Sequence, residues 1–412
     1  RWSNFCFTNS LCHKQIFLLK MKKKIAILGS TGSIGKLLID IIKKNKKQFD
    51  IILLTANKNE KLLLKQAKTL NAKNIIINDR SKFNKVSKRQ NKFKVYHDFK
   101  SLNKILNTKL DYIMSAITGI EGLKPTYLSI KHTKVIAIAN KESIICGWNI
   151  LKKNIKKYKT KVIPIDSEHF SILKLLRIID FEDIDKIFIT ASGGPFLNYK
   201  IKEFKKITPK DALKHPKWKM GKKISIDSAT LMNKIFEVIE AQKIFNIDPK
   251  KIEILIHPES LIHAIIKLKN GLNYFIYHNT SMVIPLANAI FEKKLEIKKI
   301  IKFSTTKNKN NFNNLSFKTV DSKIFPSISL IQEINKYYSA SIIINAANEI
   351  LVDQFLRKNI EFLTIFRTIK TILNDRNYKK YAIKKPKNLK QINDIDLWAK
   401  EKTMELIKLY HA

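Results

Sequence analysis

Two carboxylates stand two residues apart, at Asp166 and Glu168. The apolar residues Val162 to Ile165 before them predict the end of a buried strand. In an extended or turning backbone, alternate side chains face the same way, so both carboxylates can converge on one point. Two hard oxygen ligands suit Mg²⁺ or Mn²⁺ better than Zn²⁺. The alternative is a helix start, in which Asp166 or Ser167 is the N-cap and Glu168 lies in the first turn.

A second polar cluster is predicted on one helix further along the chain. Ser228 is a plausible N-cap for this helix. Asn233 and Glu237 are four residues apart and Lys234 and Glu237 are three apart, so all three side chains can share one face. The other positions are apolar, which places the cluster at the border of a core: Leu231, Met232, Ile235 and Phe236. The alternative is an exposed Lys–Glu pair.

A glycine-rich turn lies between a predicted strand and a predicted helix near the start. The apolar run from Lys24 to Leu28 leads into Gly29, Gly32 and Gly35, and the periodic positions 37, 38, 41 and 42 follow. Such glycines let backbone N–H groups approach a pyrophosphate at a helix N-terminus. The spacing G-x-x-G-x-x-G is a variant of the dinucleotide-binding pattern.

The end of the second predicted strand, Asp50 to Leu54, indicates which dinucleotide binds. An acidic residue is usual there for NAD, but the chain has Lys58 within the run Thr55 to Asn59. A cation in this position favours a 2′-phosphate and therefore NADP. The alternative is that Lys58 is one surface lysine among many.

Further apolar runs alternate with helical patterns, at residues 74–77, 112–114 and 135–138. This βαβ rhythm predicts a doubly wound parallel sheet over roughly residues 22–150. The polar run Ala139 to Ser143 follows the last of these strands. Residues directly beyond the carboxyl end of a parallel strand lie where such sheets bind ligands.

Two loops and two histidines add candidates to the site. The small residues 191–196 can hold an anion through backbone amides and the Ser192 hydroxyl. The segment 214–221 has the composition of a mobile cover, or of a packed surface loop. His257 and His263 are of the type that binds metals or transfers protons, but their apolar neighbours favour hydrogen-bonded structural roles.

The composition limits the class of protein. A chain of 412 residues with 44% hydrophobic residues predicts two or three domains, and it has no run of about 18 apolar residues that would span a membrane. The three cysteines, Cys6, Cys12 and Cys146, favour a reducing compartment such as the cytoplasm. The net charge of +45 raises the possibility of nucleic-acid binding. However, Lys, Asn and Ile are enriched together throughout, and no aromatic-basic pattern marks a binding face, so we expect a solvated lysine surface.

The ends of the chain differ from its middle. Residues 1–20 begin with Arg1 and are expected to be an upstream extension, with a transit peptide as the alternative, and Met21 is the expected start. The polar residues Thr305 to Asn314 predict a linker, and Ile324 to about Leu409 predict helices.

An ordered set of motifs resembles the 1-deoxy-D-xylulose 5-phosphate reductoisomerase family over about residues 22–400. The motifs are Gly-Ser-Thr-Gly-Ser-Ile-Gly (29–35), Ala-Asn-Lys-Glu-Ser (139–143), Asp-Ser-Glu-His (166–169), Ser-Gly-Gly-Pro-Phe (192–196), His-Pro-Lys-Trp-Lys-Met-Gly (215–221), Asp-Ser-Ala-Thr-Leu-Met-Asn-Lys (227–234), Ile-His-Pro-Glu-Ser-Leu-Ile-His (256–263) and Asn-Ala-Ala-Asn-Glu (345–349). The resemblance implies a homodimeric enzyme of the non-mevalonate isoprenoid pathway. It would rearrange 1-deoxy-D-xylulose 5-phosphate and reduce the product with NADPH, using Mn²⁺, Mg²⁺ or Co²⁺.

The resemblance also implies roles for single residues. The implied metal ligands are Asp166, Glu168 and Glu237. The implied NADPH-binding residues are Gly29, Thr31, Gly32, Ser33, Ile34, Asn57, Lys58, Asn59, Asn140, Glu142 and Gly221. The implied substrate-binding residues are Lys141, Ser167, Glu168, Ser192, His215, Ser228, Asn233, Lys234 and Glu237, with Ser192, Ser228, Asn233 and Lys234 around the phosphate. The implied catalytic residues are Lys141, Glu168, His215 and Trp218, of which Trp218 on the cover excludes water.

The chain departs from the family most clearly between Tyr277 and Pro285. The family typically has Pro-Asp-Met-Arg here, of which this chain keeps only Met282. Ser281 and Val283 stand in the positions of the Asp and the Arg, so both charges are lost together, which we expect to leave the chemistry intact. Asn57 replaces a usual glycine, and asparagine tolerates left-handed geometry.

The expected fold class is therefore α/β with three parts. We expect a Rossmann-like NADP-binding domain (21–160), a catalytic, metal-binding and dimerisation α/β domain (161–304), a linker (305–323) and a C-terminal helical domain (324–412). The expected partners are a sugar phosphate and a second copy of the chain, without nucleic acid or membrane. Two other classes are weighed against this assignment: another NADP-dependent dehydrogenase, such as a homoserine or semialdehyde dehydrogenase, and a basic nucleic-acid-binding protein.

The first testable prediction concerns the cofactor. Lys58→Asp is expected to raise the KM for NADPH strongly and the KM for NADH little, because only NADPH carries the 2′-phosphate that the lysine would pair with. Steady-state kinetics with each cofactor measures the difference. Equal losses with both cofactors would show that Lys58 does not read the phosphate.

Overall fold

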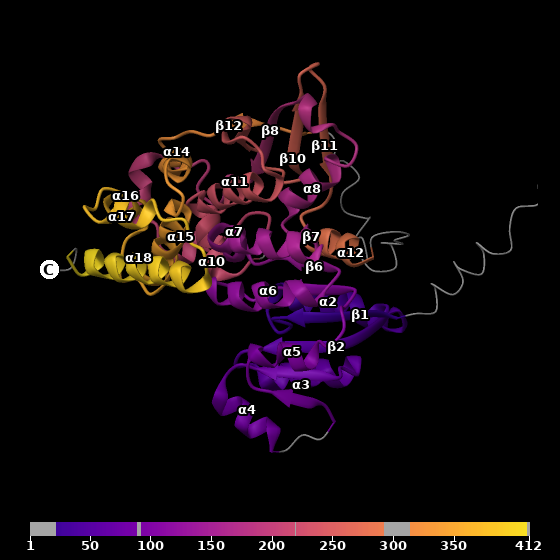
Figure 1. Cartoon of the computed structure of the whole chain (residues 1–412). Coiled ribbons are helices and arrows are strands. Elements are labelled where there is room, and N and C mark those ends of the chain that lie inside the picture. The colour runs from indigo at the N-terminus through magenta and orange to yellow at the C-terminus, as the bar shows by residue number, and fades with distance from the viewer. Residues whose placement is uncertain (1–21, 89–91, 219, 292–313, 410–412) are drawn as a thin grey trace, which may run out of the picture.

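The computed structural model describes residues 22–88, 92–218, 220–291 and 314–409. The predicted extension at residues 1–20 and all but the last residue of the predicted 305–314 linker lie outside these ranges. Strands β1 and β2 lie in the lower half of Figure 1, β8, β10 and β11 lie at the top, and the C-terminal helices α16 to α18 lie at one side.

Seven parallel strands form the first sheet, in the order β4-β3-β2-β1-β5-β6-β7. They are β1 (Lys23–Leu28), β2 (Phe49–Ala56), β3 (Asn74–Ile77), β4 (Lys94–Tyr96), β5 (Tyr112–Ser115), β6 (Val135–Ile138) and β7 (Lys161–Pro164). The order reverses between β1 and β5, and a crevice for a ligand forms beyond the carboxyl ends of the strands at such a point. This arrangement confirms the predicted Rossmann-like sheet.

The first sheet is buried on both faces, as its apolar strands require. Along β1, Ile25 and Ile27 belong to one core cluster, while Ala26 and Leu28 belong to another on the opposite face. The connecting helices are α2 (Ser33–Lys44), α3 (Glu60–Leu70), α4 (Arg80–Ser87), α5 (Leu102–Ile105), α6 (Leu123–Ser129) and α7 (Lys141–Tyr158).

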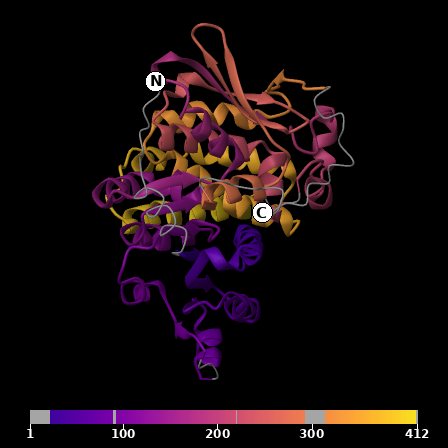
Figure 2. The ribbon, with the colours of Figure 1, turned by 90° about the vertical axis from the view of Figure 1, so that its right-hand side faces the viewer.

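A mixed five-stranded sheet follows, in the order β11-β10-β8-β9-β12. Its strands are β8 (Ile184–Ala191), β9 (Ile252–Ile256), β10 (Ile262–Leu268), β11 (Asn273–Tyr277) and β12 (Lys318–Thr319), and the accompanying helices are α8 (Ser167–Leu175), α9 (Pro209–Ala212), α10 (Lys222–Ala229) and α11 (Met232–Phe245). The β10–β11 hairpin projects from the top of the molecule in both views (Figures 1 and 2).

The helix that follows β11, α12 (Val283–Phe291), returns to the first sheet. Its Leu286 and Ile290 join the core cluster that contains helix α2, and Phe291 packs edge-on against Phe49 with 5.5 Å between ring centroids. The divergent segment 277–285 therefore connects the two sheets.

The last part of the described chain is helical, as predicted. Its helices are α14 (Leu330–Lys336), α15 (Ala340–Leu356), α16 (Phe362–Leu373), α17 (Tyr378–Ala382) and α18 (Leu389–Leu409). Helix α15 is buried along most of its length and shares a core cluster with α7 and α11. Among the helices of the described residues, none is both long and apolar enough to cross a membrane.

Candidate active site

Three carboxylates meet where the two sheets face each other. Asp166 stands at the N-cap of α8, Glu168 lies in its first turn, and Glu237 comes from the middle of α11. Carboxylate oxygens of the three lie within 4.8 Å of one another. The helix-start alternative therefore also holds, although the Asp166 side chain makes no capping hydrogen bond. Of the extended and the turning backbone that were predicted to bring Asp166 and Glu168 together, the structure has the turn, at the start of α8.

Two ammonium groups lie among these carboxylates. The Nζ of Lys141 donates to Asp166 and lies 3.2 Å from Glu237 Oε1 and 3.3 Å from Glu240 Oε2. The Nζ of Lys234 donates to Glu168 and, at 2.7 Å, to Glu237 Oε2. Burial alone would lower the pKa of each lysine, but the carboxylates outweigh it and raise both pKa values well above the ordinary range. Both lysines are therefore charged at neutral pH.

Lys234 also keeps Glu168 ionised. Burial and the nearby Glu237 carboxylate oppose the charge on Glu168, but Lys234 and hydrogen bonds at the carboxylate outweigh them, so the pKa of Glu168 is lowered. The Ser167 Oγ also donates to Glu168 Oε2, at 2.7 Å.

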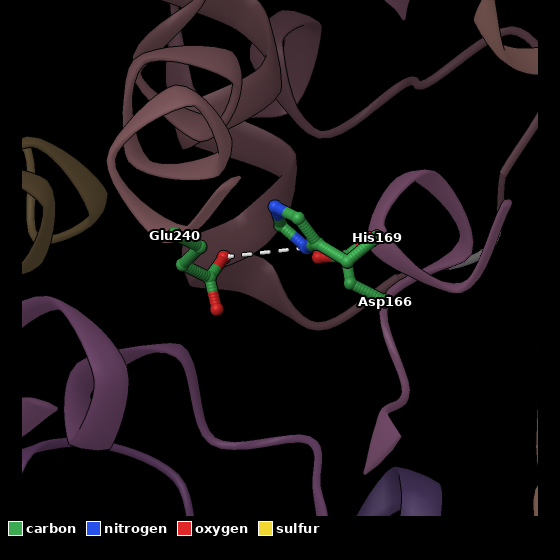
Figure 3. A group of neighbouring side chains, drawn as sticks. All are labelled: Asp166, His169 and Glu240. Atoms are coloured by element: carbon green, nitrogen blue, oxygen red, sulfur yellow. Dashed lines mark ion pairs between the residues drawn. The ribbon is translucent and has the colours of Figure 1, made fainter. Parts of the chain in front are cut away.

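A second group of possible metal ligands shares Asp166, together with His169 and Glu240 (Figure 3). The Nε2 of His169 lies 2.8 Å from the backbone oxygen of Glu237, so this nitrogen carries a proton and donates it. The other ring nitrogen, Nδ1, faces Glu240 Oε2 at 3.9 Å. Burial raises the pKa of Glu240 to about 7.

The all-carboxylate group fits a hard divalent cation better than the group with His169. Asp166, Glu168 and Glu237 offer only oxygen atoms, which Mg²⁺ and Mn²⁺ prefer. With Glu240 ionised, the four carboxylates exceed the two ammonium groups by two negative charges. A divalent cation would balance this excess. These residues therefore fit the metal that the sequence predicts.

Ser192 and His215 are hydrogen-bonded to each other in a way that suits anion binding. The Nδ1 of His215 accepts hydrogen bonds from the backbone N–H groups of Lys217 (3.1 Å) and Trp218 (2.9 Å). Burial and then the charge of Lys234 lower the pKa of His215 to about 4, so the ring is neutral and its proton is on Nε2. That proton is donated to Ser192 Oγ at 3.0 Å. The Ser192 oxygen also accepts from the Gly194 N–H at 3.2 Å, so its own proton is free to donate to a ligand.

The cover segment contacts a pair of stacked histidine rings through Trp218. Trp218 meets His263 edge-on with 6.1 Å between centroids, and His263 stacks on His278 at 3.9 Å. His263 Nε2 lies 3.3 Å from the His278 backbone oxygen, and His257 is held between Ser316 and Leu261. His257 therefore fits the structural interpretation, whereas His263 is hydrogen-bonded and also lines the smaller cavity beside Trp218. No pattern in the sequence predicted a role for His278, which lies in the divergent segment.

One of the two cavities at the site contains the catalytic candidates. A cavity of about 430 Å³ is lined by Ser33, Ile34, Lys141, Asp166, Ser167, Glu168, Ser192, His215, Trp218, Gly221, Ser228, Asn233, Lys234, Glu237 and Met282, among others. One detail differs from the predictions. Ser228 lies near the end of α10 and is not the N-cap of α11, which begins after Leu231 in a left-handed conformation (φ 63°). The predicted shared face is present, because Asn233 Nδ2 donates to Glu237 Oε1 at 2.5 Å and the Lys234 ammonium donates to Glu237 as well as to Glu168.

The other cavity, of about 840 Å³, contains the remaining part of the glycine-rich turn. Gly29, Thr31, Gly32 and Asn57 line it, together with residues of α18 such as Leu397. Gly35 packs so closely that a Cβ there would lie 2.3 Å from the Gly29 oxygen. Lys58 and Asn59 follow on the exposed surface, and the Asn59 side chain caps α3.

Asn140 and Glu142 lie at the start of α7, and neither is among the residues that line the two cavities. Asn140 is the N-cap and its side chain accepts from the Ser143 N–H. Its Nδ2 donates to the Gly119 oxygen at 3.0 Å and to Glu142 Oε2 at 2.9 Å. These bonds fix both side chains beyond β6, where the polar run 139–143 was predicted to meet a ligand.

Within the divergent segment, a side-chain hydrogen bond forms at the start of α12. Ser281 Oγ accepts from the Val283 N–H at 3.3 Å, where α12 begins. Met282 lines the smaller cavity. Ser281 therefore stabilises a helix start in the place of the family's charged aspartate.

Comparison with known proteins gives consistent matches along the chain. Family models match residues 25–147 (described as 1-deoxy-D-xylulose 5-phosphate reductoisomerase), 162–245 (the C-terminal domain of that protein) and 278–402 (DXP reductoisomerase C-terminal domain). The reductoisomerase of Pelagibacter ubique is 51% identical over 382 residues, which are 91% of this chain and 97% of that protein. The reductoisomerase of a Wolbachia pipientis strain from Culex pipiens is 40% identical, over 94% of this chain and 98% of that protein.

Two solved structures are similar over nearly their whole length. The reductoisomerase of Zymomonas mobilis in complex with NADPH has a TM-score of 0.83 and 32% identity, over 94% of this chain and 99% of that one. A DOX-P reductoisomerase in complex with NADPH, fosmidomycin and magnesium has a TM-score of 0.86 and 29% identity, also over 94% and 99%.

The protonation of His215 generates a prediction of pH dependence. The folded state keeps the ring neutral down to about pH 4, whereas an unfolded chain binds the proton near pH 6.5. The neutral His215 ring therefore makes its full contribution to the free energy of unfolding above pH 6.5, and this contribution is lost as the pH falls from 6.5 to 4. We expect this loss to be about 1 to 2 kcal/mol, below the full linkage value because the ring is partly exposed.

His215→Asn removes the titrating group and tests this prediction. Thermal unfolding of both proteins between pH 7.5 and 4.5 should show the wild type losing more stability than the variant towards low pH. Parallel curves would contradict the assignment of a neutral His215 with its proton on Nε2.

Proposed function

The chain belongs to the 1-deoxy-D-xylulose 5-phosphate reductoisomerase family, and we propose from the geometry of its site how its side chains carry out that family's reaction. The enzyme converts 1-deoxy-D-xylulose 5-phosphate to 2-C-methyl-D-erythritol 4-phosphate with NADPH and a divalent metal such as Mg²⁺, in the non-mevalonate isoprenoid pathway. The observation that carries the residue assignments is the cluster of Asp166, Glu168 and Glu237 with two lysines in one cavity. A different dehydrogenase would have no need for this cluster.

The two cavities suggest the path of NADPH. Gly29, Gly32 and Asn57 line the larger cavity and Ser33 and Ile34 line the smaller one, so the first turn of α2 lies between them. The N–H groups of this turn suit the pyrophosphate. The adenosine half would then occupy the larger cavity, near Thr31, with its 2′-phosphate towards Lys58 and Asn59. The nicotinamide half would reach the smaller cavity, near Asn140, Glu142 and Gly221.

The sugar phosphate would lie across the smaller cavity. At one end, Ser192 would donate its free proton to a phosphate oxygen, with His215 and Ser228 beside it. At the other end, Asp166, Glu168 and Glu237 would hold the metal, whose Lewis acidity would stabilise negative charge on the sugar oxygens, and Ser167 and Lys141 would lie beside those oxygens. Asn233 and Lys234 contact Glu237, so they would reach the phosphate from the metal side of the cavity.

Lys141 contributes to catalysis through its fixed charge. Its ammonium is held by three carboxylates and keeps its proton, so it can donate hydrogen bonds to a developing oxyanion without reorganisation. Glu168 stays ionised beside it. Trp218, packed against His263, closes the cavity and excludes water from an aldehyde intermediate.

We propose that the chain forms a homodimer in the cytoplasm. Strand β11 is an edge strand, and Leu272, Tyr274 and Phe275 on it or beside it are exposed (54%, 37% and 48%). An exposed apolar edge strand is suited to pairing with a second copy. The cytoplasm is consistent with the buried free thiol of Cys146. The same proposal keeps residues 21–160, 161–304 and 324–412 as the three domains.

The metal and substrate assignments predict a kinetic result. With NADPH and 1-deoxy-D-xylulose 5-phosphate, the wild type should oxidise NADPH, and a chelator should abolish this activity. Asp166→Asn, Glu168→Gln and Glu237→Gln should each lower kcat/KM by about 100-fold or more, because each removes a charge that the metal needs. NADPH affinity, measured by fluorescence titration, should change little.

Glu253→Gln is the matched control, since Glu253 is an exposed residue of β9 that pairs with Lys186. It should retain wild-type activity. NADPH oxidation that survives the chelator, or normal metal dependence in Glu237→Gln, would contradict the assignment.

The dimer proposal predicts a change of mass. Phe275→Glu places a charge on the β11 edge and should convert the dimer to a monomer in light scattering. Ile383→Glu changes an exposed apolar residue directly after α17 and should leave the dimer intact. A monomeric wild type would contradict the dimer proposal, and a Phe275→Glu protein that stays dimeric would place the interface elsewhere.

A further inference from the structure

Helix α10 connects the cover segment to the proposed phosphate site. It begins at Lys222, directly after the cover ends at Gly221, and carries Ser228 in its last turn. The helix has no side-chain cap at its N-terminus. The contacts of Lys223 on its first turn instead fix its position.

The Lys223 side chain lies between two carboxylates and an aromatic ring. Its Nζ is 2.8 Å from Asp227 Oδ2, one turn along the helix, and 3.9 Å from Glu142 Oε1 on α7. It also lies 5.4 Å from the centroid of the Phe236 ring on α11. One ammonium group therefore joins three helices.

Contacts continue from both carboxylates. Asp227 Oδ1 accepts from Asn348 Nδ2 of α15 at 2.7 Å, and both side chains are almost fully buried. Glu142 Oε2 accepts from Asn140 Nδ2, which also donates to the Gly119 oxygen. An unbroken series of polar contacts thus runs from the C-terminal helices through α10 to the cofactor crevice.

Lys223 is charged, and its ammonium group pairs with the buried carboxylate of Asp227. Burial would lower its pKa, but Asp227, Glu142 and, more weakly, Glu349 outweigh the burial and raise it. Both oxygens of Asp227 are occupied by Lys223 and Asn348, so this carboxylate acts within the protein. Removal of the ammonium alone would leave Asp227 buried and unpaired, which is costly.

We propose that Lys223 is a positioning residue that couples the binding of the cofactor to the binding of the sugar phosphate. A cofactor that orders Asn140 and Glu142 also fixes Lys223, and Lys223 fixes Asp227 and the adjacent Ser228. By linkage, a sugar phosphate held by Ser228 strengthens cofactor binding by the same factor. This inference rests on the proposed function, because it takes the cofactor and phosphate ends of the site as assigned there.

Calorimetry with an unreactive pair of ligands tests the coupling. The Kd of 1-deoxy-D-xylulose 5-phosphate is measured with Mg²⁺, in the presence and in the absence of saturating NADP⁺, which cannot reduce the sugar. For the wild type we expect the Kd to fall by about 5-fold or more with NADP⁺, within the usual range of coupling between sites. For Lys223→Met, which keeps the apolar stem, we expect the two values to agree within about 2-fold.

Two further variants control for folding and for surface charge. Lys222→Met changes the exposed neighbouring lysine and should keep the wild-type ratio. Lys223→Met with Asp227→Asn removes both charges, so no buried carboxylate is left unpaired, and it should fold normally yet still lack the coupling. A double variant that keeps the wild-type ratio would overturn the inference.

The same experiment separates this inference from the proposed function. A wild type that binds neither NADP⁺ nor the sugar phosphate would contradict the function itself. A wild type that binds both without cooperativity would leave the function standing and overturn only the role of Lys223.

Discussion

The site depends on the pairing of buried charges of opposite sign. Four carboxylates and two ammonium groups lie together where water is largely excluded, and any one of them alone would be too costly to bury. Lys141 and Lys234 keep their protons because of the carboxylates, and Glu168 keeps its charge because of Lys234. The rest of the fold serves to hold these groups at fixed distances with their charges intact.

Three helices that are distant in sequence provide the charges, and each begins or packs at the same edge. Lys141 is the first residue of α7, Asp166 caps α8, and Glu237 projects from the buried helix α11. Since α7 and α8 start after parallel strands β6 and β7, the order of the first sheet places their N-termini side by side. Helix α12 packs back onto α2 and so holds the second part of the chain against the first.

The sequence was sufficient for most strands of the first sheet and for the glycine-rich turn, but it did not predict β4, β10, β11 or β12. Apolar runs bounded by glycine or polar residues specify parallel strands well, because such strands are buried on both faces. It was not sufficient for the partners of long side chains. Lys234 contacts Glu168 across 66 residues, and no local pattern encodes that distance. Glu240 could have been found, since it lies three residues after Glu237 on the same helix face. The predicted N-cap at Ser228 was wrong because α11 begins only after Leu231, whose left-handed conformation separates α11 from α10.

The position of the first turn of α2 between the two cavities has a consequence for how the dinucleotide is held. The proposed path of NADPH places one half of the cofactor in each cavity, with the pyrophosphate joining them across the turn. The two halves then behave as tethered ligands. Once one half is bound, the other is presented at a high effective concentration, and the affinity of the intact cofactor can far exceed that of either fragment. The first turn of α2 would then hold the pyrophosphate that links the two halves of this bivalent ligand.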